Sequence, residues 1–522
     1  MRRIEILDTT LRDGAQSRGV SFSVEDKRAI ALTLDALGVP LIELGNPASS
    51  PREAEVFRRM RGEPLRHARL CAFGSTRRKN SRAELDLAAV AESGAPVAVL
   101  FGKAWLYHVR EVLGTTPEEN LRMIGDSIRF VRGQGMEVIF DAEHYFDGAR
   151  EDPSYALEVL RTARDAGART LVLCDTNGGT FPPEIARRVG EAYTLCGDCI
   201  GIHCHDDCGC AVACTLSAVS AGACHVQGTL LGFGERCGNA NLSTVIPDLQ
   251  LKLGFSCIPP ETMPGLTFAA RRVADVANIS LYKNMPYVGS NAFSHKAGMH
   301  ADGVAKSTGT FEHIDPLLVG NTRRFVTSEL AGRNLILRKL QLIAPGLTKD
   351  SPETQRILDT LKLREQAGYT YEAAEASFEL LARRTIGRCK KHFDMLFYKT
   401  IGEYPVPLDN PAAAIVKVRV DGRDALEAGE GNGPVNALDA ALRRALLRFF
   451  PRLAESYLSD FKVRVLNPEA ATAAVTRVLM TSTDGRSSWS TVGVSSDILE
   501  ACRIALEDAL EYKMMLDEKE NA

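Results

Sequence analysis

Eight short β-prone runs alternate with helix-like segments over roughly the first half of the chain, and this alternation restricts the possible folds more than any other feature. The runs are IEIL (4–7), LIELG (41–45), RLCAF (69–73), VAVLF (97–101), EVIFD (137–141), LVLCD (171–175), CIGIH (199–203) and CHVQGT (224–229). Strands that alternate with helices predict a parallel sheet. Eight such repeats fit a closed (β/α)8 barrel, and an open, doubly wound sheet is the alternative. No G-x-G-x-x-G follows an early strand, which disfavours a dinucleotide-binding open sheet.

The segment between the fourth and fifth runs carries a clear helix-start signal. Thr116 is placed as the N-cap, Pro117 as the first helical residue and Glu119 as the third, which is the pattern of a capping box. The far end of this segment, GQG (133–135), is a plausible helix stop.

Two proline-rich stretches, PPETMPG (259–265) and YPVPLDNP (404–411), divide the chain. We therefore expect a barrel over residues 1–255, a linker with helical subdomains over 256–405, and a separate domain over 411–522. The middle part is rich in charged, helix-like sequence, whereas the last part contains four strand-like runs and two helix-like segments. The expected fold class is therefore α/β: a TIM barrel, then a helical extension and a C-terminal α+β domain.

The tripeptide DGR occurs twice in the C-terminal part, at 421–423 and at 484–486, an offset of 484 − 421 = 63 residues. Each copy precedes a glycine-containing stretch and then an amphipathic helix. This spacing indicates a weak internal duplication of a small α/β unit.

Charge and cysteine content exclude several classes of protein. The formal net charge of −3 argues against a general binder of nucleic acid or anionic membranes. The chain contains no apolar run of membrane-spanning length and no signal-peptide pattern at Met1–Thr10, so we expect a cytoplasmic protein. Of 13 cysteines, eight lie from Cys196 to Cys237, and we expect reduced thiols. The C-x-x-C pair at Cys196 and Cys199 lacks a second pair at zinc-finger spacing, so a structural zinc site is disfavoured.

Polar residues recur where the predicted strands end. In a barrel, catalytic groups come from the C-terminal ends of the strands. Any one of these residues could be a helix cap or a structural hydrogen-bonding group, but together they predict a polar rim. The rim residues are Asp8, Arg12, Asp13, Glu43, Glu143, His144, Asp175, Thr176, Asn177, His203, His205, Glu235, Arg236 and Asn239.

His203 and His205 form an H-x-H pair, and residues i and i+2 of a strand point to the same side. Two imidazoles on one side are typical of half of a divalent-metal site, although two histidines with structural roles would give the same pattern. Asp13, from the neighbouring first strand, is a candidate third ligand, and Arg12 is a nearby cation for an oxyanion. The chain has no P-loop and no G-x-S-x-G elbow, so a Lewis-acid site is favoured over a nucleophile.

Three motifs resemble those of the DRE-TIM metallolyase superfamily: LDTTLRDGAQ (7–16), GIHCHDD (201–207) and GERCGNANL (234–242). Within it, the chain resembles the Claisen-condensing acyltransferases, which include 2-isopropylmalate, homocitrate and citramalate synthases. HADG (300–303) resembles their acetyl-CoA-side motif, and the C-terminal part resembles their allosteric domain. Stretches such as DAEHYFDG (141–148) and GNGPVNALDAALR (431–443) are closest in character to the citramalate synthase clade.

The resemblance implies roles for particular residues. Asp13, His203, His205 and Asn239 would ligate a divalent metal (Mn, Zn or Mg). Arg12 would stabilise the developing alkoxide, and Gln16 and Thr176 would bind the keto acid together with Arg12. Glu143, His300 and Asp302 would complete the catalytic set near acetyl-CoA. Whether Glu143 or His300 removes the first proton is left open.

The implied reaction condenses acetyl-CoA with pyruvate, and hydrolysis then gives citramalate and CoA, in isoleucine biosynthesis. The resemblance also implies a homodimer with isoleucine as feedback inhibitor, and no nucleic-acid or membrane partner. The alternatives are 2-isopropylmalate or homocitrate synthesis and, more remotely, a non-enzymatic amino-acid sensor. A lyase of the hydroxymethylglutaryl-CoA type is less consistent with this sequence, because such lyases lack the C-terminal domain.

Two positions depart from the family pattern. Asp206 replaces the asparagine of H-x-H-N-D, and we expect it to add negative charge beside the metal. Phe311 stands where relatives often carry tyrosine.

Overall fold

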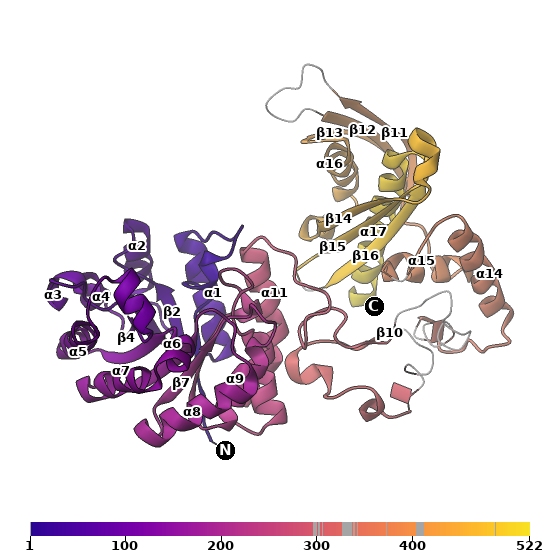
Figure 1. Cartoon of the computed structure of the whole chain (residues 1–522). Coiled ribbons are helices and arrows are strands. Elements are labelled where there is room, and N and C mark those ends of the chain that lie inside the picture. Colours follow the sequence, from indigo (N-terminus) through magenta and orange to yellow (C-terminus); the bar gives the residue numbers. More distant parts are fainter. Residues whose placement is uncertain are drawn as a thin grey trace. The chain divides into compact units, whose positions relative to one another are not determined.

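The computed structural model divides into two compact units, Met1–Ser294 with Glu312–Arg324, and His295–Phe311 with Phe325–Ala522 (Figure 1). The structure describes residues 2–295, 300, 303–304, 306–325, 337, 340–341, 343–371, 373–402, 412–485 and 487–521.

The first unit contains a closed barrel in which each parallel strand pairs with the next and β8 pairs with β1. All eight predicted strands are confirmed, and the closed barrel is confirmed over the open sheet. The strands are β1 (Glu5–Asp8), β2 (Leu41–Gly45), β3 (Arg69–Ser75), β4 (Val97–Lys103), β5 (Glu137–Glu143), β6 (Thr170–Asp175), β7 (Ile200–Cys204) and β8 (His225–Gly228).

Helices surround the barrel (Figure 1). α1 begins at a complete capping box, because Ser23 and Asp26 exchange side-chain to backbone hydrogen bonds, and it ends at Gly38, whose φ is 88°. The helices of this unit are α1 (Val24–Leu37), α2 (Pro51–Met60), α3 (Ala83–Asp86), α4 (Ala88–Glu92), α5 (Pro117–Gly133), α6 (Tyr145–Glu151), α7 (Pro153–Ala166), α8 (Pro182–Cys196), α9 (Ala211–Ser220), α10 (Leu242–Pro247) and α11 (Leu266–Val276).

The N-terminus of α5 forms only half of the predicted capping box. Thr116 accepts a hydrogen bond from the backbone N–H of Glu119. The Glu119 carboxylate instead bonds Arg77 and Arg122, because two guanidinium groups lie within reach.

The inside of the barrel is filled by apolar side chains that alternate along the strands with residues facing the helices. Two members of this inner cluster are cysteines, as expected of thiols used as small apolar residues. Its buried members are Leu7, Leu41, Cys71, Val97, Val99, Ile139, Val172 and Cys174.

The chain after the barrel first returns to it. α11 packs against α1 and contributes buried residues to the same apolar core. β9 (Ser294–His295) and β10 (Arg324–Phe325) are short, and the second unit then adds α14 (Pro352–Gln366) and α15 (Glu375–Thr385). The domain limits at 255 and 405 stay predictions.

The C-terminal part repeats one pattern: three antiparallel strands followed by a helix. The DG pairs of the two repeated tripeptides, at 421–422 and 484–485, lie between the second and third strands of each copy, which confirms the predicted duplication. The first copy is β11 (Asp394–Gly402), β12 (Ala412–Val420), β13 (Arg423–Gly431) and α16 (Pro434–Leu447); the second is β14 (Tyr457–Val465), β15 (Thr476–Thr483), β16 (Ser488–Ser495) and α17 (Ile498–Asn521).

Two strands of the first copy differ from the sequence prediction. β11 lies in the region predicted to be helical, and that prediction is wrong there: the segment pairs with β12 from Asp394 to Gly402, with one irregularity between Met395 and Phe397. β13 was not predicted as a strand, because two of its nine residues are glycines.

All 13 cysteines are free thiols. Within the described part of the chain, no helix is long and apolar enough to cross a membrane.

Candidate metal and substrate site

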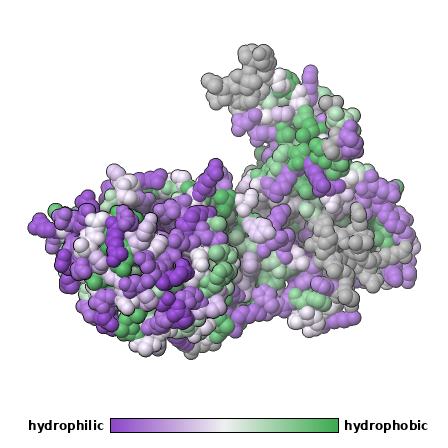
Figure 2. All heavy atoms as spheres, in the orientation of Figure 1, coloured by the Kyte–Doolittle hydropathy of each residue, from purple (hydrophilic) through white to green (hydrophobic). Residues whose placement is uncertain are grey.

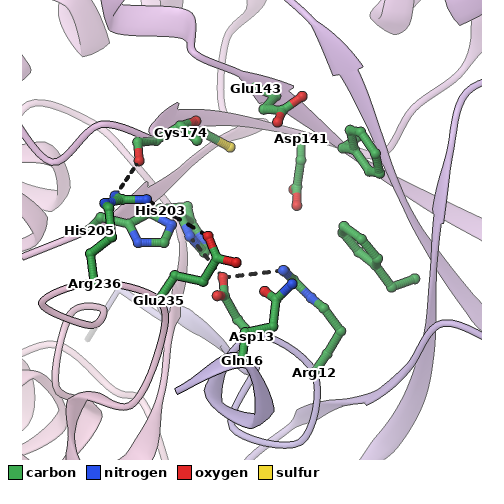
Figure 3. A pocket seen from close by; sticks show the side chains of 13 residues that line it. Arg12, Asp13, Gln16, Asp141, Glu143, Cys174, His203, His205, Glu235 and Arg236 are labelled. Carbon is green, nitrogen blue, oxygen red and sulfur yellow. Dashed lines mark hydrogen bonds and ion pairs between the residues drawn. The ribbon is translucent and has the colours of Figure 1, made fainter. Parts of the chain in front are cut away.

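A cavity of about 230 Å³ opens at the C-terminal ends of the barrel strands (Figure 3). Thirteen side chains line it, and most are polar or charged, as the rim prediction requires. They are Arg12, Asp13, Gln16, Phe73, Phe101, Asp141, Glu143, Cys174, Thr176, His203, His205, Glu235 and Arg236.

The structure therefore brings together most of the residues singled out from the sequence. Asn239 does not line the cavity, but it forms a backbone bridge with His205. The other rim residues have local roles: Asp8, for example, accepts hydrogen bonds from the backbone of Thr10 and Leu230 and so fastens β1 to the segment after β8. The rim residues outside the cavity are Asp8, Glu43, His144, Asp175, Asn177 and Asn239.

Asp13, His203 and His205 are all buried, and their candidate ligand atoms lie within 4.8 Å of one another. His203 Nε2 is 3.4 Å from Asp13 Oδ2. A tight turn positions Asp13: its backbone N–H and that of Arg12 both donate to the carbonyl of Thr9. The cluster thus has the N/O donor set and the convergence that a divalent cation needs.

Two buried polar atoms without hydrogen-bond partners support a cation site here. Asn239 Oδ1 and His205 Nδ1 are buried and have no hydrogen-bond partner, although buried polar atoms are nearly always paired. The Asn239 amide nitrogen donates to the Phe233 carbonyl at 3.1 Å, which fixes its oxygen as the free atom. A cation bound here would satisfy these atoms, so the residues fit the implied metal.

Electrostatics keep the ligands in metal-binding protonation states. Burial lowers the pKa of His203 to about 4, so its imidazole is neutral at physiological pH. Burial alone would raise the pKa of Asp13, but Arg12 and the two histidines outweigh it, and the net shift is downward. Asp13 is therefore an ionised carboxylate.

Arg12 is held at the cavity wall by three contacts. Its Nε donates to Glu43 at 2.7 Å, its Nη1 lies 3.2 Å from Asp13, and its guanidinium lies 3.9 Å from the centre of the Phe73 ring. The charges of Glu43 and Asp13 overcome burial and raise the Arg12 pKa, so the guanidinium stays charged. Glu43, predicted as a rim residue, therefore positions Arg12 rather than lining the cavity.

Two further predicted residues reach the cavity with usable groups. Glu143 forms an ion pair with Lys103 at the end of β4. Thr176 Oγ1 accepts the backbone N–H of His144 at 2.9 Å, which leaves the hydroxyl proton of Thr176 free to donate.

Sequence reasoning missed two polar residues inside the barrel, Asp141 and Gln227. Asp141 Oδ1 accepts from Gln227 Nε2 at 2.8 Å, and Gln227 Oε1 lies 2.9 Å from His203 Nδ1. Burial, with a smaller contribution from the charge of Glu43, raises the pKa of Asp141 to about 8. The two-residue period of a strand offered a signal, because Asp141 shares the inward face of Ile139 and Glu143.

The expectation for Asp206 is wrong. Asp206 does not line the cavity, and its carboxylate accepts the backbone N–H of Ala211 at 2.8 Å, which fastens the loop to the first turn of α9. The neighbouring Asp207 instead pairs with Arg236. Asp206, one residue after the candidate ligand His205, bonds the start of a helix instead of entering the cavity.

The predicted acetyl-CoA-side residues belong to the second unit. The exposed His300 stacks on Phe311, with ring centroids 4.1 Å apart. Asp302 lies outside the described residues.

Comparison with known proteins agrees with this geometry. The HMGL-like family matches residues 3–261, the homocitrate synthase post-HMGL domain-like family matches 287–367, and the LeuA allosteric (dimerisation) domain matches 372–514. The barrel, its rim and the duplicated C-terminal part thus define an HMGL-like barrel enzyme with a LeuA-type allosteric domain.

Proteins that match this chain over nearly its full length identify the family within this class. An (R)-citramalate synthase of Synechocystis sp. is 48% identical over 98% of this chain and 96% of its own length. One of Aquifex aeolicus is 47% identical over 99% of both chains. A 2-isopropylmalate synthase of Pyrococcus furiosus is more distant, at 34% identity over 98% of this chain and 99% of its own length. The chain belongs to the (R)-citramalate synthase family.

Proposed function

We propose that this acyltransferase condenses acetyl-CoA with pyruvate and hydrolyses the resulting thioester, releasing (R)-citramalate and CoA. The observation that carries the proposal is the convergence of Asp13, His203, His205 and Arg12 on one cavity, in a chain that shares full-length similarity with (R)-citramalate synthases.

Asp13, His203 and His205 hold the divalent metal, with Asn239 Oδ1 as the fourth protein ligand. The neutral imidazoles and the ionised carboxylate are the required ligand states. When bound, the metal supplies Lewis acidity toward the keto acid. The donor set accepts Mn²⁺, Zn²⁺ or Mg²⁺, and its nitrogen donors favour the first two.

Arg12 stabilises the negative charge that develops on the keto oxygen during carbon–carbon bond formation. Its contacts with Glu43 and Phe73 hold the guanidinium before substrate arrives, so little reorganisation is needed. The free hydroxyl proton of Thr176 and the amide of Gln16 bind the pyruvate carboxylate.

Glu143 acts on the acetyl methyl group. Its carboxylate lines the cavity and can accept the methyl proton, which generates the enolate that attacks pyruvate. His300 and Asp302, from the HADG segment, take part on the acetyl-CoA side.

The C-terminal part is the regulatory domain of a homodimer and binds isoleucine as feedback inhibitor. Exposed apolar side chains on its strands support an interface, and Figure 2 shows hydrophobic surface gathered in the region of the sheet formed by β11, β12 and β13. They include Leu396, Phe397 and Ile401 on β11 and Leu426 on β13. The cytoplasmic location stays a prediction.

Pyruvate-dependent release of CoA tests the proposal. With acetyl-CoA and Mn²⁺, thiol release should require pyruvate and should fall by at least about 100-fold in His203→Ala. The control is His67→Ala, which changes a histidine outside the cavity. Equal CoA release from both variants would contradict the proposed metal site.

A further inference from the structure

The imidazole of His203 lies at one end of a chain of buried hydrogen bonds that starts at Asp141. Gln227 is completely buried on β8, between the two. Its Nε2 donates to Asp141 Oδ1 at 2.8 Å, and its Oε1 lies 2.9 Å from His203 Nδ1. The three side chains come from β5, β8 and β7, so the chain crosses the inside of the barrel.

The direction of these bonds fixes the protonation of the His203 ring. The Asp141 oxygen accepts a hydrogen bond from the amide NH₂ of Gln227, as a carboxyl oxygen can in either protonation state, and this bond turns the amide oxygen toward His203. That oxygen can only accept, so His203 Nδ1 must carry the ring proton. The lone pair of His203 is therefore on Nε2, the atom that faces Asp13 at 3.4 Å.

We propose that Gln227, oriented by Asp141, is a positioning residue that locks His203 into its metal-ligating tautomer. It acts through His203 and does not itself line the cavity. Partners of this kind raise ligand basicity and hold the ring orientation, and their loss typically weakens metal binding by about 10- to 100-fold.

A comparison with His205 shows what the chain of hydrogen bonds adds to His203. The Nδ1 atom of His205 is buried without a hydrogen-bond partner, and within the described structure no hydrogen bond to either ring nitrogen fixes the tautomer of His205. Of the two histidine ligands, His203 is thus the one whose ligating atom is set before the metal arrives.

Gln227→Met tests the inference, because methionine keeps the length of the side chain and removes both hydrogen bonds. We expect Mn²⁺ affinity, measured by calorimetry on metal-free protein, to fall by about 10-fold or more. Asp141→Asn should retain near-native affinity, since asparagine can still accept from Gln227, whereas Asp141→Val should weaken binding like Gln227→Met.

Glu5→Met is the matched control. Glu5 Oε2 lies 3.0 Å from Nδ1 of His225, a buried histidine on β8, so this variant removes an analogous contact away from the cavity. Its Mn²⁺ affinity should equal that of the unaltered protein. Thermal unfolding of each metal-free variant confirms that it is folded.

A second readout reports the tautomer directly. In ¹⁵N-edited NMR spectra of metal-free protein, His203 should be protonated on Nδ1, and Gln227→Met should populate the Nε2-protonated form. Unchanged Mn²⁺ affinity in Gln227→Met, or an Nε2-protonated His203 in the unaltered protein, would overturn the inference. The inference rests on the proposed metal site, and failure of the unaltered protein to bind Mn²⁺ would refute that site instead.

Discussion

Arg12 shows how neighbouring residues convert an ordinary cation into a fixed part of a site. Glu43 accepts a hydrogen bond from Nε of Arg12, and the Phe73 ring covers the face of the guanidinium. The remaining guanidinium edge points toward Asp13 and the cavity. Lysine carries one compact ammonium group and cannot make all three contacts.

Arg12→Lys should therefore lower kcat/KM for pyruvate by roughly 100-fold. Mn²⁺ affinity should change far less, because Arg12 is not a ligand. Steady-state kinetics and calorimetry separate the two effects. Arg77→Lys is the control, since Arg77 is a similarly buried arginine that pairs with Glu119 and Asp126. A loss of kcat/KM in Arg77→Lys as large as in Arg12→Lys would contradict the proposed role of Arg12.

The raised pKa of Asp141 predicts that the stability of the protein depends on pH. The pKa of Asp141 in the folded protein, about 8, lies above the ordinary value of 3.8 because it is buried. The folded state therefore binds this proton more tightly than the unfolded state, and the stability it contributes is lost as the pH rises from about 4 to about 8.

Asp141→Asn cannot titrate, so its stability relative to the unaltered protein should improve as the pH rises from 5 to 8. The improvement should reach up to about 1.4 kcal/mol per pH unit. Urea denaturation of metal-free protein measures it. A constant difference between the two proteins across this range would show that Asp141 does not titrate as described.

The candidate metal ligands were predictable from the sequence at this scale, but the residues that position them were not. H-x-H and the acid after the first strand mark His203, His205 and Asp13 through a spacing that few other structures require. Gln227 and Asp141 act through contacts between strands 86 residues apart, which no local pattern encodes.

The strands of the barrel were predictable because each is a buried, β-prone run bounded by polar or glycine-rich sequence. β13 is less apolar and contains glycine, and β11 follows helices in a charged region. Both strands form because they pair with β12, so tertiary context decided their structure.

The N-terminus of α5 gives a prediction at the scale of an element. Thr116 satisfies the backbone N–H of Glu119, whereas the Glu119 side chain is engaged elsewhere. Thr116→Ala should lower the free energy of unfolding by about 1 kcal/mol, and Thr116→Ser should restore most of it. Chemical denaturation of the full chain measures both. An equal loss in the serine and alanine variants would show that the hydroxyl is not the stabilising group.

The whole molecule combines an eight-stranded barrel with a duplicated module that contains two three-stranded sheets. The repeat of three strands and a helix explains why DGR recurs at an interval of 484 − 421 = 63 residues, because the DG pair of each copy lies between the second and third strands of its own repeat. The match to a LeuA allosteric (dimerisation) domain assigns the module to regulation and assembly.

We expect light scattering of the full chain to give twice the mass of one chain, and isoleucine to inhibit CoA release more strongly than leucine or valine does. Two copies would bury the apolar side chains now exposed on β11 and β13. A monomer at micromolar concentration, or equal inhibition by all three amino acids, would contradict the proposed regulation.

The choice of keto acid tests the central claim most directly. Pyruvate and 2-oxoisovalerate should be offered in competition with acetyl-CoA and Mn²⁺, and the products separated by chiral chromatography and mass spectrometry. We predict that (R)-citramalate is the dominant product and that His203→Ala forms none. Preferential formation of 2-isopropylmalate, or a racemic product that His203→Ala also forms, would contradict the account.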